Sequence, residues 1–238
     1  MEDSAQAAGL KQKLQDYKPS AATIELVQNT PILLLVGVSG AGKDSIKHQL
    51  LKTRRYHHIV SHTTRRPREN QGILEQDGRE YHFINLADAE KMLDDGAFVE
   101  AKMYSGNVYG TSAAEIQRAH DEHKIALTDI EVQGVAEYET ITDSVQALFV
   151  LPPSYEVWQQ RLKSRYEGVI EHEDIRRRMQ TAKTELHEAL QKDYFRFVIN
   201  DDLDRAVETA DTIAHGAPPG RESETARALA QDLLAKLN

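Results

Sequence analysis

The chain has 238 residues, which is enough for one α/β domain with an insertion and short for two full domains. It contains no cysteine, so disulfide bonds and thiolate metal sites are excluded. A net charge of -9 argues against a nonspecific nucleic-acid-binding protein, and no apolar run approaches the ~20 residues that span a bilayer. Because the amino-terminal segment also lacks the apolar core of a signal peptide, we expect a cytoplasmic protein with no nucleic-acid or membrane partner.

The order of apolar and polar segments predicts an α/β fold. Residues 1–30 form an N-terminal extension that is expected either to fold as one or two short helices on the main domain or to be partly disordered. Apolar runs predict strands at 32–36, 58–61, 125–129, 147–151 and 195–200. Amphipathic stretches predict helices near 43–54, 112–121, 133–140, 154–164, 173–191 and 202–214. Such alternation is typical of parallel strands joined by right-handed helical crossovers.

Segment 63–110 interrupts this alternation. It contains three short apolar pieces, one helical stretch around 87–95, and turn signals at 76–78 and 105–107, and it is predicted to be a small mixed α+β insert. The core of the fold would then comprise residues 31–62 and 111–215. A glycine- and proline-rich break at 216–220 separates this core from a last helical pattern at 221–237, so residues 216–238 are read as a linker and a terminal helix.

A glycine-rich loop follows directly on the first predicted strand. Residues 37–45 read GVSGAGKDS, which is the pattern G-x-x-x-x-G-K between a strand and a helix that phosphate-binding loops require. Its glycines let successive amide N–H groups point at phosphate oxygens, while Lys43 would reach the outer phosphates. The residues predicted to bind ATP in this loop are Gly37, Val38, Ser39, Gly40, Ala41, Gly42, Lys43, Asp44 and Ser45.

Asp44 departs from the phosphate-loop pattern, which has a Mg²⁺-binding serine or threonine hydroxyl at this position. A carboxylate can bind Mg²⁺ directly or through water, but without the ion it would repel ATP, so strict metal dependence is expected. Ser45 is a poor substitute because one residue further along a helix points about 100° away. Asp129, at the end of an apolar strand, is the second candidate metal ligand, since an acid in this position orients the waters of the ion.

Groups that recognise phosphates and polar rings concentrate in residues 61–68 and 75–83. Arg65 and Arg68 could converge on one phosphate, because a planar guanidinium matches paired phosphate oxygens. Further hydroxyl and carboxyl groups suit either that phosphate or the edge of a guanine ring, namely Ser61, Glu75, Tyr81, Glu100, Tyr109 and Thr111.

Residues 31 to about 214 resemble the guanylate kinases, which move a phosphoryl group from ATP to GMP. The resemblance runs in the expected order through GVSGAGK, SHTTRRPR, DGREYHF, FVEAKMYSGNVYGTS, DIEVQG, FVLPPS, RLKSR and VINDDLD. It implies a P-loop NTPase core with a parallel sheet flanked by helices, an NMP-binding insert at 63–110 and a helical lid at 161–178. It also implies ATP as co-substrate, Mg²⁺ as cofactor and a place in purine nucleotide metabolism.

The resemblance implies a role for each matching residue. GMP or dGMP would be held by Ser61, Arg65, Arg68, Glu75, Tyr81, Glu100, Tyr109, Thr111 and Glu131. The catalytic set would be Lys43, Arg65 and the lid residues Arg161, Arg165 and Arg178. Asn200 would lie near the adenine, and Asp129 would help to organise Mg²⁺, whereas the proposed metal role of Asp44 rests on its carboxylate and not on the resemblance.

Two alternatives stay open beside this interpretation. The GKDS ending of the phosphate loop also resembles the ribose bisphosphate phosphokinases, whose acceptor has no base, although Glu75 and Glu100 have little purpose without guanine. Some guanylate-kinase-like modules bind peptides and catalyse no reaction. These modules typically lack the phosphate-loop lysine, which this chain has as Lys43. Trp158 is predicted to be a core residue, and the oligomeric state is not readable from the sequence.

Overall fold

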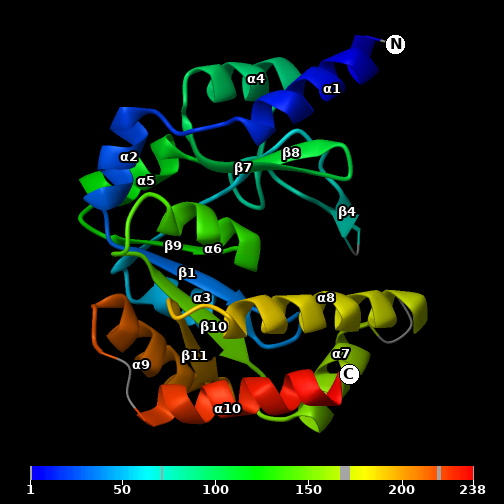
Figure 1. The fold of residues 1–238 in the computed structure, drawn as a ribbon, viewed down its shortest axis with the longest axis vertical. Helices are drawn as coiled ribbons and strands as arrows, with labels where there is room; N and C mark the ends of the chain where they lie inside the picture. Colours follow the sequence, from blue (N-terminus) through cyan, green and yellow to red (C-terminus); the bar gives the residue numbers. More distant parts are fainter. Residues whose placement is uncertain (1, 71, 167–171, 219–220, 238) are drawn as a thin grey trace. The chain divides into compact units, whose positions relative to one another are not determined.

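A computed structural model of the chain describes residues 2–70, 72–166, 172–218 and 221–237 (Figure 1). The chain divides into two compact units. Unit 1 comprises Met1–Pro31, His57–Ala126 and Glu137–Asp143, and unit 2 comprises Ile32–Tyr56, Leu127–Ala136 and Ser144–Asn238. None of the helices in the described ranges is long and apolar enough to cross a bilayer.

Unit 2 carries the central strands of a five-stranded sheet, whose order is β11-β10-β1-β9-β2. Strands β1 (Ile32–Gly37), β10 (Gln146–Leu151) and β11 (Phe195–Ile199) pair in parallel, as the alternation of apolar and amphipathic segments predicts. Every residue of β1 is buried, which is typical of a parallel strand covered on both faces. The carboxyl end of β1 leads directly into the glycine-rich loop.

The strand predicted at 58–61 is wrong in position. The structure places β2 at Tyr56–His58 and begins a different strand, β3, at His62–Thr63. The amide of Val60, between them, donates to the Oε2 atom of Glu115 at 2.9 Å instead of to a strand. Ile59 and Val60 are buried, so the apolar run predicted their burial correctly but did not predict which residues pair in a strand. Strand β9 (Ile125–Asp129) has the predicted bounds.

The predicted helices after the glycine-rich loop, apart from the one in segment 63–110, begin and end within about two residues of their predicted positions. They are α3 (Lys43–Lys52), α5 (Ala113–Asp121), α6 (Val132–Glu139), α7 (Tyr155–Tyr166), α8 (His172–Leu190), α9 (Leu203–Ala214) and α10 (Arg221–Lys236). In unit 2, α10 packs against β11 and α8, and α3 packs against α9 (Figure 1). Asp202 caps the amino end of α9 by accepting from the amide of Arg205 at 2.9 Å.

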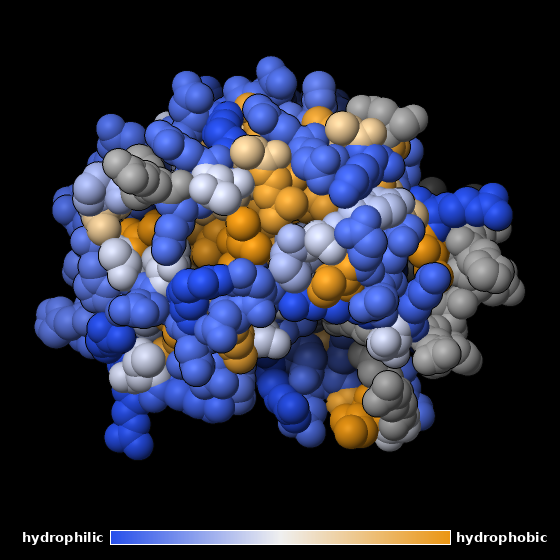
Figure 2. All heavy atoms as spheres, turned by 90° about the horizontal axis from the view of Figure 1, so that it is seen from below, coloured by the Kyte–Doolittle hydropathy of each residue, from blue (hydrophilic) through white to orange (hydrophobic). Residues whose placement is uncertain are grey.

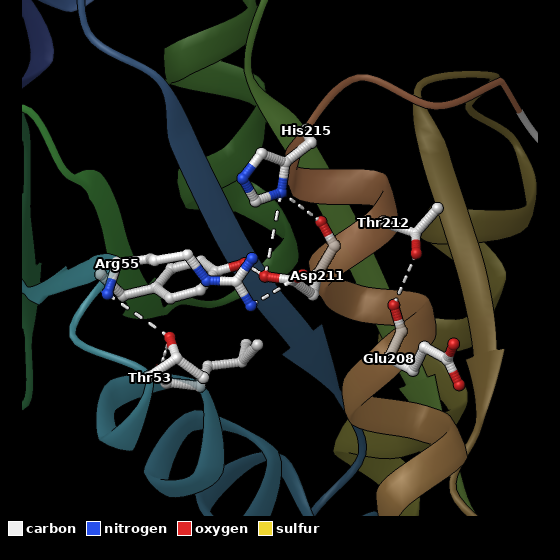
Figure 3. Close-up of polar contacts among 8 residues, drawn as sticks. Thr53, Arg55, Glu208, Asp211, Thr212 and His215 are labelled. Atoms are coloured by element: carbon white, nitrogen blue, oxygen red, sulfur yellow. Dashed lines mark hydrogen bonds and ion pairs between the residues drawn. The ribbon is translucent and has the colours of Figure 1, made fainter.

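A polar network joins the segment after α3 to α9 (Figure 3). The hydroxyl of Tyr56 donates to Oδ1 of Asp211 at 2.6 Å, and a guanidinium nitrogen of Arg55 lies 3.0 Å from Oδ2 of the same carboxylate. Burial raises the pKa of Tyr56, and its bond to Asp211 raises it further, so the phenol stays a donor. On α9, His215 also bonds the backbone oxygen of Asp211 (2.7 Å). The network therefore ties the segment that follows α3 to α9.

Unit 1 is built around a four-stranded mixed sheet in the order β6-β3-β8-β7. Strand β6 (His82–Phe83) runs parallel to β3, whereas β8 (Asn107–Ser112) is antiparallel to β3 and to β7 (Phe98–Tyr104). Helix α4 (Leu86–Asp94) precedes β7, and a hairpin of β4 (Glu69–Asn70) and β5 (Ile73–Leu74) forms a separate small sheet. The mixed α+β character predicted for segment 63–110 is confirmed.

The two amino-terminal helices, α1 (Glu2–Gln15) and α2 (Ala21–Gln28), belong to unit 1. Leu10 of α1 is 1% exposed and packs in a cluster with Leu93 and Phe98. The hydroxyl of Tyr17 donates to the carbonyl oxygen of Phe98 at 2.6 Å and accepts from the amide of Phe98 at 2.9 Å. These helices were expected on the main domain as an extension, but they complete the core of unit 1.

Polar side chains cover most of the face drawn in Figure 2, around a smaller hydrophobic area. The charged residues of the chain make up 28% of its sequence, which accounts for this surface. Among the described residues, the exposed large hydrophobic side chains include Ile73 and Leu74 on the β4–β5 hairpin and Tyr104 at the end of β7.

Candidate active site

The glycine-rich loop between β1 and α3 leaves no room for a Cβ atom at two of its glycines. Gly37 and Gly42 have φ angles of +138° and +97°. A Cβ atom at Gly37 would overlap the carbonyl oxygen of Val150, and one at Gly42 would overlap the side-chain nitrogen of Asn200. The glycine spacing in the sequence thus reflects two close approaches from β10 and from the residue after β11.

Carbonyl oxygens of this loop are bound inside the protein. The oxygen of Gly37 accepts from the ammonium of Lys43, that of Val38 accepts from the amide of Ala41 (3.1 Å), and that of Ala41 accepts from Asn200 Nδ2 (2.8 Å). The oxygen of Ser39 accepts from the indole N–H of a tryptophan on α7 at 2.7 Å. Because these negative ends of the peptide dipoles are already bound, the loop presents a favourable environment for an anion at the amino end of α3.

The tryptophan that binds Ser39 is Trp158, and it was predicted to be a core residue. Its side chain is buried as expected, at 1% exposed, but its indole nitrogen also supports the loop. Arg161, one turn further along α7, donates to the backbone oxygen of Asn200 at 3.1 Å and to that of Ala41 at 3.4 Å. Both side chains therefore support the backbone of the loop through hydrogen bonds that the sequence pattern does not indicate.

The two predicted metal ligands, Asp44 and Asp129, share one lysine. The ammonium of Lys47 donates to Oδ1 of Asp129 and lies 3.9 Å from Oδ1 of Asp44. Burial raises the pKa of Asp129, but the charges of Lys47 and Lys43 outweigh it and hold that pKa below its usual value. Asp44 lies in the first turn of α3, where its charge interacts favourably with the helix dipole. Lys47 is missing from the sequence prediction, although it follows Lys43 by one helical turn.

Helix α8 adds one arginine and one acid to the phosphate loop. Arg178 donates to the hydroxyl of Ser39 at 3.3 Å. Burial raises the pKa of Glu185 to about 7, the positive charge of Lys43 lowers it, and the nearby acid Glu131 raises it. Glu185 is therefore a second group near the loop that the sequence prediction lacks.

Two predicted features of the lid lie outside the described residues. They are the side chain of Arg165 and the backbone of residues 167–171.

In unit 1, the predicted acceptor residues Arg65, Tyr81 and Tyr109 lie together. The guanidinium carbon of Arg65 lies 5.3 Å from the ring centroid of Tyr81 and 5.8 Å from that of Phe83. The rings of Tyr81 and Tyr109 are 5.9 Å apart in an edge-to-face arrangement. An almost buried guanidinium surrounded by phenol groups is suited to a small anion such as a phosphate.

Glu75 has other partners than the guanine edge expected for it. Its carboxylate accepts from both terminal nitrogens of Arg65, at 2.8 and 3.1 Å, and from the backbone amide of Arg68 at 2.8 Å. The pKa of Glu75 is lowered by the hydrogen bond from Arg65, which opposes the effect of burial. The amide of Glu75 also donates to the backbone oxygen of Arg68 (2.9 Å), so the β4–β5 hairpin keeps the two positions opposite each other. Glu75 therefore orients the guanidinium of Arg65 and fixes the backbone at Arg68.

Glu100 on β7 lies opposite Thr111 on β8 and is 8% exposed. Burial raises the pKa of Glu100 to about 7, although hydrogen bonds from Thr111 oppose the shift. Three residues that the sequence analysis missed surround it. Two of them, Lys102 and Glu137, form an ion pair at 3.1 Å. The third, Tyr138, is fully buried. Burial raises the pKa of Tyr138, and the charge of Glu100 raises it further.

Three further predicted residues, Ser61, Ser45 and Glu131, lie at the ends or on the surface of secondary-structure elements. Ser61 directly precedes β3, and its carbonyl oxygen accepts from the amide of His82 at 2.9 Å. Ser45 and Glu131 are exposed, the first on α3 and the second just before α6. Within the described ranges, no group of three or more histidine, aspartate or glutamate side chains is arranged to hold a metal ion.

Comparisons with known proteins agree with these features. The family model described as guanylate kinase matches residues 28–215. A curated guanylate kinase from Syntrophotalea carbinolica is 36% identical over 182 residues, which cover 76% of this chain and 83% of that protein. The guanylate kinase of Schizosaccharomyces pombe is 34% identical over 184 residues, which cover 76% of this chain and 88% of that protein.

Two further relatives differ in what they show. Guanylate kinase 1 of Oryza sativa subsp. japonica is 35% identical over 179 residues, and the match spans 74% of this chain but only 45% of that longer protein. The crystal structure of guanylate kinase from Anaplasma phagocytophilum superposes with a TM-score of 0.57 at 21% identity, covering 84% of this chain and 90% of that one, which shows a shared fold. Given a family model matched from residue 28 to residue 215 and relatives of comparable length at 34–36% identity, the chain belongs to the guanylate kinase family.

Proposed function

We propose that this protein transfers the γ-phosphoryl group of ATP to GMP or dGMP, giving ADP and GDP or dGDP, in purine nucleotide metabolism. The observation that carries the proposal is the Arg65 cluster of unit 1, in which Glu75 clamps a nearly buried guanidinium beside the rings of Tyr81 and Tyr109. Unit 2 separately carries the loop for the phosphates of the donor. A kinase that acts on a second nucleotide needs one such site for each substrate.

The transfer requires no general base. The phosphate of GMP is the nucleophile, and with a second pKa near 6 it is largely ionised at neutral pH. The arginines of unit 1 offset its charge, so that it can approach a second anion. Lys43 exchanges the oxygen of Gly37 for phosphate oxygens of ATP, and Arg161, Arg165 and Arg178 stabilise the charge of the transferring group. Asn200, which supports the loop, would lie near the adenine.

Mg²⁺ fits the donor set of unit 2. Asp44 and Asp129 offer two carboxylates, and the ammonium of Lys47 already binds there as a cation. Mg²⁺ commonly takes one or two carboxylates and otherwise binds phosphate oxygens and water, so two acids are sufficient. When bound, the ion neutralises and orients the phosphates of ATP.

Base recognition in the proposed function belongs to Glu100, Ser61, Thr111 and Glu131. A carboxylate accepts from the two N–H donors on the guanine edge, and the hydroxyls donate to its acceptors. Glu100 is held ready by Thr111 in a buried position where an unpaired charge is unfavourable, so a ligand with two donors is strongly preferred over one without them. Action in the cytoplasm and the absence of nucleic-acid partners stay predictions.

An ATP-consumption assay with GMP, dGMP, AMP, UMP and ribose 1,5-bisphosphate tests the proposal. We expect turnover with GMP and dGMP, little with the other nucleotides, and a loss of several orders of magnitude in the Lys43→Ala variant. Lys52→Ala, at the other end of the same helix, is the matched control and should retain activity. Turnover with ribose 1,5-bisphosphate in place of GMP, or no detectable ATP binding, would refute the proposed function.

A further inference from the structure

Lys47 lies in contact with both carboxylates that are proposed to hold Mg²⁺. It follows Lys43 by four residues, so the two ammonium groups lie on the same face of α3. Its nitrogen is bonded to Asp129 and is 3.9 Å from Asp44. The side chain of Lys47 is only 18% exposed, whereas that of Asp44 is 68% exposed. This lysine therefore points inward to the end of β9.

The charges around Lys47 balance without a metal ion. The carboxylates of Asp44 and Asp129 are offset by the ammonium of Lys47, which lies within ion-pair distance of both, and the charge of Lys43 also acts on Asp129. A divalent cation on these carboxylates would lie close to the ammonium of Lys47 and would be repelled by it. Lys47 thus makes the binding of a divalent metal ion to the nucleotide-free loop unfavourable.

We infer that Lys47 is a positioning residue that keeps divalent metal away from Asp44 and Asp129 until nucleotide phosphates are present. The inference rests on the proposed function for the identity of that nucleotide. Phosphate oxygens add several negative charges beside Lys43, which attract the metal and offer Lys47 a second partner. The metal then enters together with the nucleotide.

The same contact explains how the loop accommodates an acid in place of a hydroxyl. Asp44 and Lys47 are three residues apart on one helix, at a spacing where opposite charges attract. Lys47 therefore offsets the repulsion that Asp44 would exert on ATP phosphates. Asp44 and Lys47 act as a pair, and changing one alters what the other does.

Binding of Mn²⁺ to the nucleotide-free protein, followed by electron paramagnetic resonance, tests the inference. Compared with the wild type, we expect Lys47→Met to bind Mn²⁺ about tenfold more tightly or better, because a unit charge near a divalent ion is removed. Lys47→Arg keeps the charge and should bind like the wild type. The double variant Lys47→Met, Asp129→Asn should lose the gain, and Lys52→Met is the control for removing a lysine elsewhere on α3.

Unchanged or weaker Mn²⁺ binding in Lys47→Met would overturn the inference, and so would equal gains in Lys47→Met and Lys52→Met. Circular dichroism and thermal unfolding verify that each variant is folded, and Lys47→Gln replaces Lys47→Met if the latter is not. The measurement contains no nucleotide, so it is independent of the GMP assay. A protein that fails to phosphorylate GMP could still show the gain in metal affinity, and an active enzyme could still lack it.

Discussion

Replacing Glu100 with glutamine should change how the stability of the protein depends on pH. The carboxyl is 8% exposed, and burial raises its pKa to about 7 from an ordinary value of 4.5. Between these two values the folded protein keeps a proton that the unfolded chain has released. The free energy of unfolding therefore falls as the pH rises from about 4.5 to 7, and the stability present at low pH is lost as the pH passes the folded pKa.

The size of this effect follows from the two pKa values. At about 1.4 kcal/mol per pH unit, the difference between 7 and 4.5 corresponds to about 3 kcal/mol, which is a large part of the stability of an ordinary domain. Glutamine has nearly the same shape and stays neutral at every pH. Relative to the wild type, Glu100→Gln should thus gain about 3 kcal/mol in unfolding free energy between pH 4 and pH 8.

Urea unfolding of the two proteins by circular dichroism across this pH range measures the difference, in which the other titrating groups cancel. Glu69→Gln removes an exposed carboxylate of the same unit and should leave the pH dependence of the wild type in place. A difference between wild type and Glu100→Gln that is constant over the whole range would refute the reasoning.

The same variant should bind GMP more weakly, because glutamine offers one acceptor oxygen where the carboxylate offers two. Guanine N–H donors favour the ionised carboxylate, so GMP binding to the wild type should release a proton below pH 7. Its GMP affinity should rise with pH more steeply than that of Glu100→Gln, in which only the GMP phosphate titrates. Parallel pH profiles, or equal GMP affinities at pH 8, would show that Glu100 does not contact the base.

Three other substitutions separate the roles assigned by the structure. Glu75→Gln should raise the KM for GMP about tenfold or more, because a charge-assisted bond to Arg65 is weakened. The preference for GMP over AMP should stay intact, and a lost preference would show that this acid recognises the base instead. Trp158→Phe should raise the KM for ATP about threefold to tenfold but leave that for GMP unchanged, because the bond to the backbone oxygen of Ser39 is lost. An equal change in both KM values would show that Trp158 does more than support the glycine-rich loop. Tyr56→Phe should lower the free energy of unfolding by about 2 kcal/mol in urea titrations, because the side chain loses its hydrogen bond to Asp211 (Figure 3). Both KM values should stay unchanged, and an unaltered stability would contradict the role assigned to Tyr56.

The order of elements and the phosphate loop could be predicted from the sequence because both depend on neighbours along the chain. Helices ended within about two residues of their predicted limits, and strand β9 was placed without error, since hydrophobic periodicity reports local structure. Gly37, Gly42 and Lys43 were recognised from spacing alone. The structure adds the reason, which is that β10 and Asn200 leave no room for a Cβ atom.

Partners that lie far apart in the sequence could not be predicted in this way. The strand expected at 58–61 failed because the amide of Val60 bonds a glutamate of α5, and no local pattern reports that contact. The motif that contains Glu75 likewise does not indicate its bonds to the side chain of Arg65 and to the amide of Arg68, while a contact of Glu75 with guanine stays a prediction.

The sequence by itself therefore determined the fold class, the position of the glycine-rich loop and most of the residues that are proposed for each nucleotide site. Only the tertiary structure decided how those residues are paired, which of them are buried, and hence how their charges behave. Lys47 and Asp129 are 82 positions apart, yet their contact decides the charge balance of the proposed metal site. Pair energies and pKa values depend on distance and solvent exposure, and both arise only when the chain has folded.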